Sequence, residues 1–270
     1  MRGTRHSVTS ADGVSIGLLT AGTGADLLLV HGGAGQIEAW APVWDALTRR
    51  WRVTAMDRRG RGTSSDAEPY AIGGEYADVA AVAGYLAGRA GGPVDVFGHS
   101  YGAVCALGAV AAAAPVRRLV LYEPPGPAAA PAEWAGRMTC MVSRGQAGRA
   151  MFSFLTEIIG MTPARVGELR NVPRSYDVLA VVAATLPREA RALAGVDLPR
   201  LARTVACPVL LLLGTQSPAW AQANTAALAA ALPGADLVTL PGQGHDAVDA
   251  APELLVAELN RFLGGGRPGA

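Results

Sequence analysis

A serine between glycines is the clearest candidate for covalent chemistry in this chain. The segment 98-GHSYG-102 follows an apolar run and precedes an alanine-rich segment that ends near Pro115. A tight strand-to-helix turn with this G-x-S-x-G pattern strains the backbone of the serine and presents its hydroxyl above the edge of a sheet. The bare pattern is common, but the strand-turn-helix context predicts Ser100 as a nucleophile rather than as an ordinary capping serine.

A serine hydroxyl needs a general base, and the composition narrows the choice. The 270 residues contain no lysine, and all 23 Lys-plus-Arg residues are arginine, which rules out a lysine base and Schiff-base chemistry. Of the four histidines, His245 follows the last apolar run in 241-PGQGHDA-247, where a loop could lower its imidazole onto Ser100. Such a base contributes about 10²- to 10⁴-fold to the rate. We predict His245 as the base, with a surface-loop histidine as the alternative.

The elements that must position these residues alternate between short apolar runs and helix-like segments. This pattern predicts an α/β fold with a mostly parallel sheet. The expected strands cover 14–22, 26–32, 52–57, 94–100, 117–123, 209–216 and 236–240. The expected helices cover 40–47, 75–89, 101–114, 220–232 and 252–263.

The alternation stops between residues 126 and 195. This stretch has no convincing strand and instead contains helix-like pieces at 132–142, 147–159, 163–171 and 176–186. We therefore predict an α/β core over 1–125 and 196–264, a helical cap over 126–195, and a flexible tail over 265–270.

Four motifs, in this order, resemble those of the α/β-hydrolase fold family. They are 31-HGG-33, 57-DRRGRGTS-64, 98-GHSYG-102 and 244-GH-245, and the resemblance spans about residues 10–263. It implies an eight-stranded, mostly parallel sheet flanked by helices, with a cap after strand six. It also implies a serine nucleophile and an oxyanion hole formed by the backbone N–H groups of Gly33 and Tyr101. The arginines of the second motif are expected to be structural or solvated.

The chain departs from the family pattern at the acid of the triad. Most relatives carry an aspartate after the seventh strand, whereas 214-GTQSP-218 places Ser217 there. A serine cannot stabilise an imidazolium as a carboxylate does. A subset of the family carries its acid at the end of strand six, where this chain has Glu123. We predict Glu123 as the residue that orients His245; the alternatives are Asp246 or Asp249, a Ser–His dyad, or a degenerate site.

The predicted cap is rich in methionine and aromatic residues, which suit adaptable apolar binding, although most such residues pack helices against each other. We expect a mostly apolar acyl or aromatic substrate. The candidate lining residues are Trp40, Trp134, Met138, Phe152 and Phe154. For Trp40, a place in the core is an equal alternative.

The leading functional prediction is a serine hydrolase that cleaves a carboxylic ester of a largely apolar small molecule through an acyl-enzyme on Ser100. The same triad could serve a C–C bond hydrolase, a lactonase, or a thioesterase or cyclase of a biosynthetic pathway. A ligand-binding protein with a hydrolase-like fold is the alternative from another class. The resemblance disfavours haloalkane dehalogenases and epoxide hydrolases, because those relatives carry aspartate as the nucleophile.

Composition bears on partners and location. A formal net charge of +1 argues against a nucleic-acid partner, which usually calls for a strongly basic face. Apolar runs such as 209–214 are far shorter than the roughly 20 residues of a membrane span, and the N-terminus lacks the apolar core of a signal peptide. Three scattered cysteines form no metal-binding pattern. We expect a cytoplasmic monomer or homodimer that acts on a small molecule without cofactor or metal.

Overall fold

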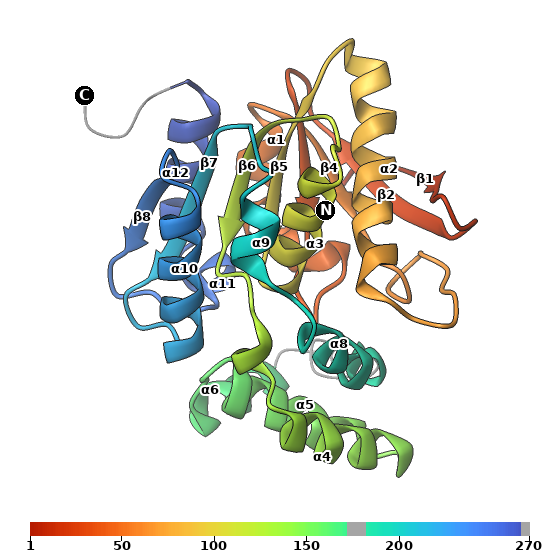
Figure 1. Ribbon diagram of the computed structural model, residues 1–270, viewed down its shortest axis with the longest axis vertical. Coiled ribbons are helices and arrows are strands. Elements are labelled where there is room, and N and C mark those ends of the chain that lie inside the picture. Colours follow the sequence, from red (N-terminus) through yellow and green to blue (C-terminus); the bar gives the residue numbers. More distant parts are fainter. Residues whose placement is uncertain (172–181, 266–270) are drawn as a thin grey trace.

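The strands pair into a single sheet in the computed structural model, which describes residues 1–171 and 182–265. Within these residues the sheet has 8 strands in the order β1-β2-β4-β3-β5-β6-β7-β8 (Figure 1). The strands are β1 (Thr4–Thr9), β2 (Ser15–Ala21), β3 (Asp26–Val30), β4 (Arg52–Met56), β5 (Val94–His99), β6 (Val116–Tyr122), β7 (Val209–Gly214) and β8 (Asp236–Leu240). β2 is antiparallel to both of its neighbours, and the pairs from β4 to β8 are parallel. The predicted α/β class with a mostly parallel sheet is confirmed.

β1 is the one strand that the sequence pattern did not predict. Its residues alternate between exposed and half-buried positions and pair along their full length with β2. An edge strand of this kind faces solvent on much of its surface, so its sequence carries polar residues and lacks the apolar run that marks a central strand.

Helices cover both faces of the sheet because the central strands are buried on both sides. Leu28 and Val30 of β3 belong to the apolar cluster under α2, α3, α9 and α10, whereas Leu27 and Leu29 belong to the cluster under α1, α11 and α12. This period of two follows from the pleat of the strand. The helices are α1 (Ala41–Thr48), α2 (Ile72–Ala90), α3 (Tyr101–Ala111), α9 (Leu198–Ala202), α10 (Ala219–Ala231), α11 (Ala247–Ala250) and α12 (Pro252–Leu263), with a short 3-10 helix, η1 (Ile37–Trp40), before α1.

The chain between β6 and β7 contributes a separate helical layer, here called the cap. Its elements are η2 (Pro127–Ala129), α4 (Ala132–Ser143), α5 (Ala147–Ser153), the π-helical turn η3 (Phe154–Ile158), α6 (Pro163–Asn171), η4 (Ala183–Thr185) and α8 (Leu186–Leu193). In Figure 1 these helices lie below one end of the sheet, with α8 nearest to the core. They share an apolar cluster of their own, centred on Met138, Met151 and Val166.

Two sequence predictions differ from the structure or fall outside it. The single helix predicted over 147–159 is divided into α5 and the π-helical turn at Phe154. Residues 176–181 of the last predicted cap helix, and 266–270 of the predicted tail, lie outside the described residues. Of the helices that the structure describes, none combines the length and apolarity that crossing a membrane would require.

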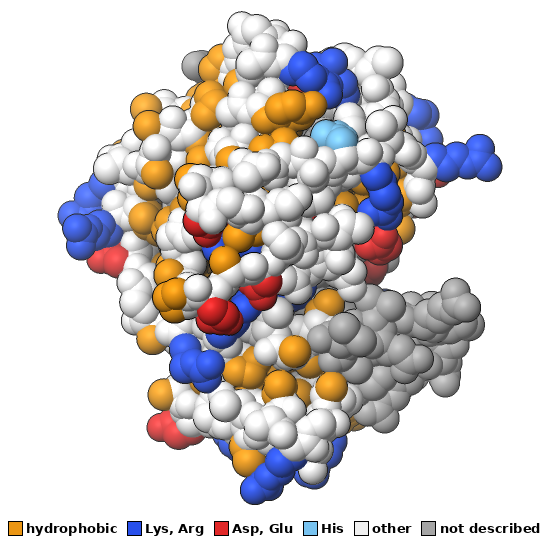
Figure 2. Space-filling model, turned by 90° about the vertical axis from the view of Figure 1, so that its right-hand side faces the viewer, with side chains coloured by type: hydrophobic (Ala, Val, Ile, Leu, Met, Phe, Trp, Pro, Cys, Tyr) orange, Lys and Arg blue, Asp and Glu red, His pale blue; other side chains and the backbone are white. Residues whose placement is uncertain are grey.

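Charged side chains of both signs are interspersed on the face shown in Figure 2. Arginines occur at several separate points of this face, and acidic residues lie beside some of them. The three arginines of 57-DRRGRGTS-64 contribute almost nothing to the surface, because Arg58, Arg59 and Arg61 are each at most 2% exposed.

Candidate active site

Ser100 lies at the turn between β5 and α3, where two parallel neighbours, β3 and β6, flank β5. Its φ of 55° is in the left-handed region, which a non-glycine residue rarely adopts. The flanking glycines are required by close packing: a Cβ on Gly98 would lie 2.6 Å from Ala103 Cα, and one on Gly102 would lie 2.2 Å from the carbonyl oxygen of Val30. The G-x-S-x-G pattern therefore reflects a turn in which the backbone passes close to its neighbours.

Glu123 and His245 form a buried pair beside this turn. The His245 Nδ1 lies 2.6 Å from Glu123 Oε2, and the two side chains are 3% and 0% exposed. Glu123 follows β6 with a φ of 49°, so its strained backbone turns the carboxylate toward the loop after β8. With Nδ1–H donated to the carboxylate, Nε2 is the nitrogen left to accept a proton. No hydrogen bond of the described residues joins the ring of His245 to Asp246 or Asp249.

Ser217 has a role that the sequence analysis missed. Its hydroxyl donates to Glu123 Oε1, and the backbone N–H of Gly214 donates to the same oxygen at 2.7 Å. Both donors come from the end of β7 and the segment after it. Ser217 stands where the family pattern places the acid, and here it fixes the carboxylate of Glu123, the predicted acid. The sequence signal for this contact was the combination of a serine at that position with a glutamate at the end of β6.

His99 holds the loop that carries His245. Its Nε2 lies 3.0 Å from the carbonyl oxygen of His245, and the two rings are 4.8 Å apart. Burial, and then the nearby His245, lower the pKa of His99 to about 3, so the ring is neutral at physiological pH and can donate to that carbonyl. The Tyr122 hydroxyl donates to the carbonyl of Gly244 in the same loop. His99 thus positions the loop that carries the predicted base.

The His245 Nε2 has no hydrogen-bond partner among the residues that the structure describes. Ser100 and His245 nevertheless line the same open cleft. Hydrogen bonds between a nucleophile and its base are often longer without substrate and shorten in the complex. Ser100 and the free nitrogen of the predicted base therefore border one cavity.

The loop after β3 brings Gly33 next to Ser100. A Cβ on Gly32 would lie only 3.0 Å from Ser100 Cβ. The Gly32 carbonyl faces inward, where Arg58 Nη1 donates to it at 3.1 Å and His31 Nδ1 lies at 2.9 Å. In a trans peptide the N–H points opposite to the carbonyl, so the N–H of Gly33 points away from Arg58. Gly33 and Tyr101 line the same enclosed pocket as Ser100.

Two arginines of 57-DRRGRGTS-64 belong to a buried ion cluster behind this loop. Arg58 pairs with Glu75 of α2 at 2.7 Å and with Glu189 of α8 at 2.7 Å, and Arg61 pairs with Glu189 at 2.6 Å. Burial alone would lower the pKa of Arg58, but Glu189 and Glu75 outweigh it and raise the pKa well above its usual value. These arginines are therefore structural rather than solvated, and they connect the core to the cap.

Two cavities meet at Ser100. The enclosed one has a volume of about 30 Å³ and is lined mainly by apolar cap and core residues, including Trp134 and Phe154. The open cleft has a volume of about 750 Å³ and is lined by His245, Asp246 and Asp249 together with the loop after β3. Among the described residues, no cluster of three or more His, Cys, Asp or Glu side chains could hold a metal ion.

The structure separates the five predicted lining residues. Trp134 and Phe154 line the enclosed pocket. Trp40 is 1% exposed and packs against Phe97 in the core at 5.2 Å between ring centroids, while also bordering the open cleft. Met138 and Phe152 line neither cavity, so their prediction is wrong.

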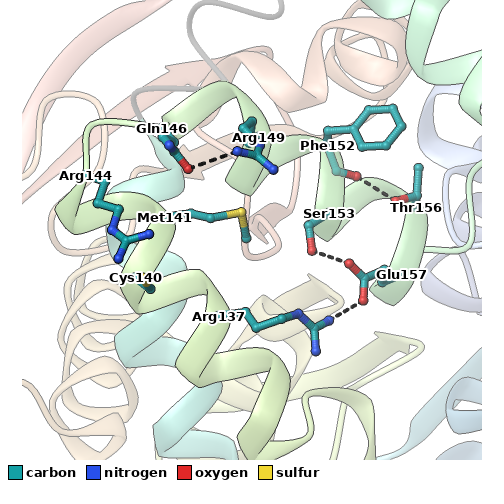
Figure 3. Close-up of a pocket in the computed structure, with 10 residues that line it drawn as sticks. All are labelled: Arg137, Cys140, Met141, Arg144, Gln146, Arg149, Phe152, Ser153, Thr156 and Glu157. Carbon is teal, nitrogen blue, oxygen red and sulfur yellow. Dashed lines mark hydrogen bonds and ion pairs between the residues drawn. The ribbon is translucent and has the colours of Figure 1, made fainter.

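The orientation of the cap helices explains this correction. Met138 is fully buried between cap helices. Phe152 lines a separate pocket on the outer side of the cap, between α4 and α5, together with Arg137, Arg144 and Arg149 (Figure 3). An apolar residue on a short amphipathic helix identifies a buried face but not which of two neighbouring layers that face meets.

Comparison with known proteins agrees with this geometry. Residues 27–258 match the model of the alpha/beta hydrolase family. An alpha/beta hydrolase from Sphaerobacter thermophilus DSM 20745 is 32% identical, with a TM-score of 0.83 over 96% of this chain and 100% of that chain. The 2-(acetamidomethylene)succinate hydrolase of Mesorhizobium japonicum (strain LMG 29417 / CECT 9101 / MAFF 303099) is 25% identical over 93% of this chain and 92% of its own length.

A third similarity extends to the fold alone. The esterase RhEst1 from Rhodococcus sp. ECU1013 is 24% identical, with a TM-score of 0.77 over 97% of this chain and 98% of that chain. The resemblance that the four sequence motifs predicted is thus confirmed by the matched family model and by the 32% identical structure. The chain belongs to the alpha/beta hydrolase family.

Proposed function

We propose that this hydrolase cleaves a carboxylic ester through an acyl-enzyme on Ser100. The observation that carries the proposal is the buried pair of Glu123 and His245, joined at 2.6 Å, beside a serine in a strained strand-to-helix turn. A histidine oriented by a buried carboxylate next to such a serine is the arrangement that nucleophilic acyl transfer requires.

The reaction would proceed in two steps, acylation of Ser100 and hydrolysis of the acyl-enzyme. Ser100 Oγ attacks the ester carbonyl carbon while His245 Nε2 takes the hydroxyl proton, and the N–H groups of Gly33 and Tyr101 bind the oxyanion. As the ester C–O bond breaks, His245 returns the proton to the departing alcohol. Water then attacks the acyl-enzyme with His245 again as base, which releases the carboxylic acid and restores Ser100.

The two cavities support one orientation of the substrate. The leaving alcohol must be next to the group that protonates it, and His245 lines the open cleft but not the enclosed pocket. The alcohol therefore belongs in the cleft of about 750 Å³. The acyl group belongs in the mainly apolar pocket of about 30 Å³, beside both oxyanion donors. This pocket favours a short acyl chain.

A second candidate reaction uses the same residues on an amide. The 25% identical relative is named for a substrate with an acetamido group, and an acetyl group is among the few acyl groups short enough for the enclosed pocket. Hydrolysis of an acetamide would follow the same steps, with an amine in place of the alcohol. A lactone, a thioester or a C–C bond substrate would also use this triad.

Labelling and a substrate panel together test the proposal. A fluorophosphonate should label the wild-type protein on Ser100 and leave Ser100→Ala unlabelled. The panel should contain 4-nitrophenyl esters of increasing acyl length, a lactone, a thioester and an N-acetyl amide, with Ser100→Ala as the blank. A folded protein that resists labelling from pH 6 to pH 9 and turns over none of these substrates would overturn the proposal.

A further inference from the structure

Glu189 is a polar side chain in the otherwise apolar lining of the enclosed pocket, and its two oxygens are unequally paired. The residue is 3% exposed. Its Oε1 accepts from Arg58 Nη2 at 2.7 Å and from Arg61 Nη2 at 2.6 Å, and the Thr185 hydroxyl lies at 3.4 Å from it. Its Oε2 has no hydrogen-bond partner within residues 1–171 and 182–265. The hydrogen bonds to this carboxylate thus all fall on one oxygen.

The unpaired oxygen borders the space over the oxyanion loop. A Cβ placed on Gly33 would lie 3.4 Å from Glu189 Oε2, 3.5 Å from Leu186 Cδ2 and 3.6 Å from Phe154 Cζ. All four residues line the enclosed pocket with Ser100. An acyl group whose carbonyl oxygen contacts the Gly33 N–H would therefore extend past Glu189 Oε2.

A buried carboxylate oxygen without a donor is energetically unfavourable, because it has lost its contact with water. Most of the remaining lining consists of apolar side chains, among them Pro125, Ala129, Ala130, Ile158 and Leu193. The donors that also line the pocket already have partners: the indole N–H groups of Trp134 and Trp220 donate to the Ser153 hydroxyl and to the carbonyl oxygen of Ile158, and the Tyr101 hydroxyl pairs with that of Tyr70. A donor on the substrate would satisfy this oxygen and gain an interaction with a charged acceptor. An apolar acyl group of the same size would leave it unpaired.

The charges around Glu189 favour a neutral donor over a cation. Arg58 and Arg61 carry two positive charges, and Glu75 and Glu189 carry two negative ones, all with side chains at most 4% exposed. The cluster is already neutral, so a buried ammonium group would add an uncompensated charge. A hydroxyl donates without changing this balance.

We propose that Glu189 Oε2 accepts a hydrogen bond from a hydroxyl group on the acyl part of the substrate, so that the preferred substrates are esters of short hydroxy acids. This inference rests on the proposed ester hydrolysis and specifies its acyl group. The pocket volume of about 30 Å³ holds about two water-sized groups. The CH₂ and OH of a hydroxyacetyl group are two such groups, and they extend from a carbonyl placed at Ser100 with the hydroxyl one carbon away from it.

Three 4-nitrophenyl esters test the recognition in the wild-type protein. Hydroxyacetate and propionate have acyl groups of nearly equal size and differ by a hydroxyl in place of a methyl group. Methoxyacetate retains the electron-withdrawing oxygen but cannot donate. After correction for spontaneous alkaline hydrolysis, kcat/KM for hydroxyacetate should exceed that for either of the others by about 10- to 100-fold, as for a hydrogen bond to a charged group.

Two matched variants assign the preference to Glu189. In Glu189→Gln the donors from Arg58 and Arg61 fix the amide oxygen at the Oε1 position, which places the NH₂ group where Oε2 was. The hydroxyacetate-to-propionate ratio should then fall about tenfold. Glu75→Gln removes the same charge from the same cluster, but Glu75 does not line the pocket, so the ratio should stay within about twofold of wild type.

The outcomes separate this inference from the proposed function. Wild-type turnover of all three esters at similar corrected kcat/KM would overturn the role of Glu189 and leave ester hydrolysis intact. An equal change of ratio in both variants would show that the cluster, and not the Oε2 acceptor, sets the preference. If Glu189→Gln does not fold, the wild-type ratio of kcat/KM for hydroxyacetate to that for propionate still tests whether the pocket recognises the hydroxyl group. Absence of turnover together with absence of Ser100 labelling would instead overturn the proposed function.

Discussion

Two buried glutamates near Ser100 differ in how completely their oxygens are paired. Glu123, at the end of β6, has a partner on each oxygen: His245 on Oε2, and Gly214 with Ser217 on Oε1. Glu189, on α8 of the cap, has donors on Oε1 only. Both are at most 3% exposed, so burial alone does not distinguish them.

The difference indicates what each carboxylate can do. A carboxylate with all its acceptor positions directed at the protein fixes the side chains around it, and Glu123 accordingly orients the ring of His245. A carboxylate with one oxygen directed into a cavity can still bind something that enters the cavity. Under this comparison, changes around Glu123 should lower the turnover of every substrate, and changes around Glu189 should alter selectivity and stability.

The largest expected effect is on turnover at the Glu123 side. In Glu123→Gln, the donors from Gly214 and Ser217 hold the amide oxygen, so the NH₂ group faces His245 Nδ1 and forces the proton onto Nε2. His245 then cannot act as base, and kcat should fall about 10³- to 10⁴-fold for hydroxyacetate and propionate esters alike. Steady-state kinetics measures kcat, and urea unfolding checks that the variant is folded as stably as the wild type. A near-wild-type kcat would return the orienting role to Asp246 or Asp249.

The second prediction concerns stability at the Glu189 side. Arg58→Met removes the cation that pairs with both Glu75 and Glu189, which leaves buried negative charge uncompensated. The free energy of unfolding should fall by about 3–5 kcal/mol. Arg137→Met is the matched control, because its partner Glu157 and Arg137 itself are 47% and 53% exposed, and it should cost less than about 1 kcal/mol. Similar losses in the two variants would contradict the importance of the buried cluster.

A smaller effect on kcat should follow from removing one hydrogen bond to Glu123 while keeping the residue itself. Ser217→Ala deletes one of the two donors on Oε1 and retains the Gly214 N–H. We expect kcat to fall about tenfold, with no change in the ratio of hydroxyacetate to propionate turnover. A changed ratio with unchanged kcat would mean that Ser217, at the end of β7, affects substrate selection. It would contradict the view that changes around Glu123 affect turnover and changes around Glu189 affect selectivity.

The last prediction is a pH dependence of stability. Burial lowers the pKa of His31, and burial together with His245 lowers the pKa of His99 to about 3. Between the folded pKa and the usual value of about 6.5, the unfolded chain binds the proton, so stability falls as pH drops below about 6.5, by about 1.4 kcal/mol per pH unit for each such histidine.

The variant His99→Gln tests this slope. A glutamine retains a donor for the carbonyl of His245 but does not titrate. Urea unfolding at pH 7 and pH 5 should show a shallower loss of stability in His99→Gln than in wild type, by the contribution of one histidine. An identical slope in the two proteins would show that His99 can be protonated in the folded state.

Much of the core followed from the sequence because its signals are local. Continuous apolar runs mark strands buried on both faces, and those predicted for β3 to β8 coincide with the observed strands to within two residues at either end. The candidate residues Ser100, Glu123 and His245 each follow such a run. Since neighbouring parallel strands end at the same edge of a sheet, the predicted arrangement places the three residues at one edge, and the resemblance to the hydrolase family supplied the role predicted for Glu123.

The remaining site could not be predicted in this way because it depends on which faces and partners meet in space. Met138 and Phe152 have the apolar character of lining residues, yet one is buried inside the cap and the other lines its outer pocket. Arg58 and Arg61 looked structural or solvated, and their burial depends on Glu189, which is more than 120 residues away along the chain. Ser217 looked like a lost acid and instead donates to Glu123.

The sequence by itself determined the family, the order of the core elements, and the residue types available for chemistry. A strained turn needs its glycines, and in a chain without lysine histidine is the residue whose usual pKa best suits a base at neutral pH, so both features can be recognised in the sequence. Only the tertiary structure decided how carboxylate oxygens are shared among donors. That sharing depends on side chains from β6, β7 and the cap that meet in the protein interior, where an unpaired polar oxygen is energetically costly. The spacing of these residues in the sequence does not reveal how close they lie in the folded chain.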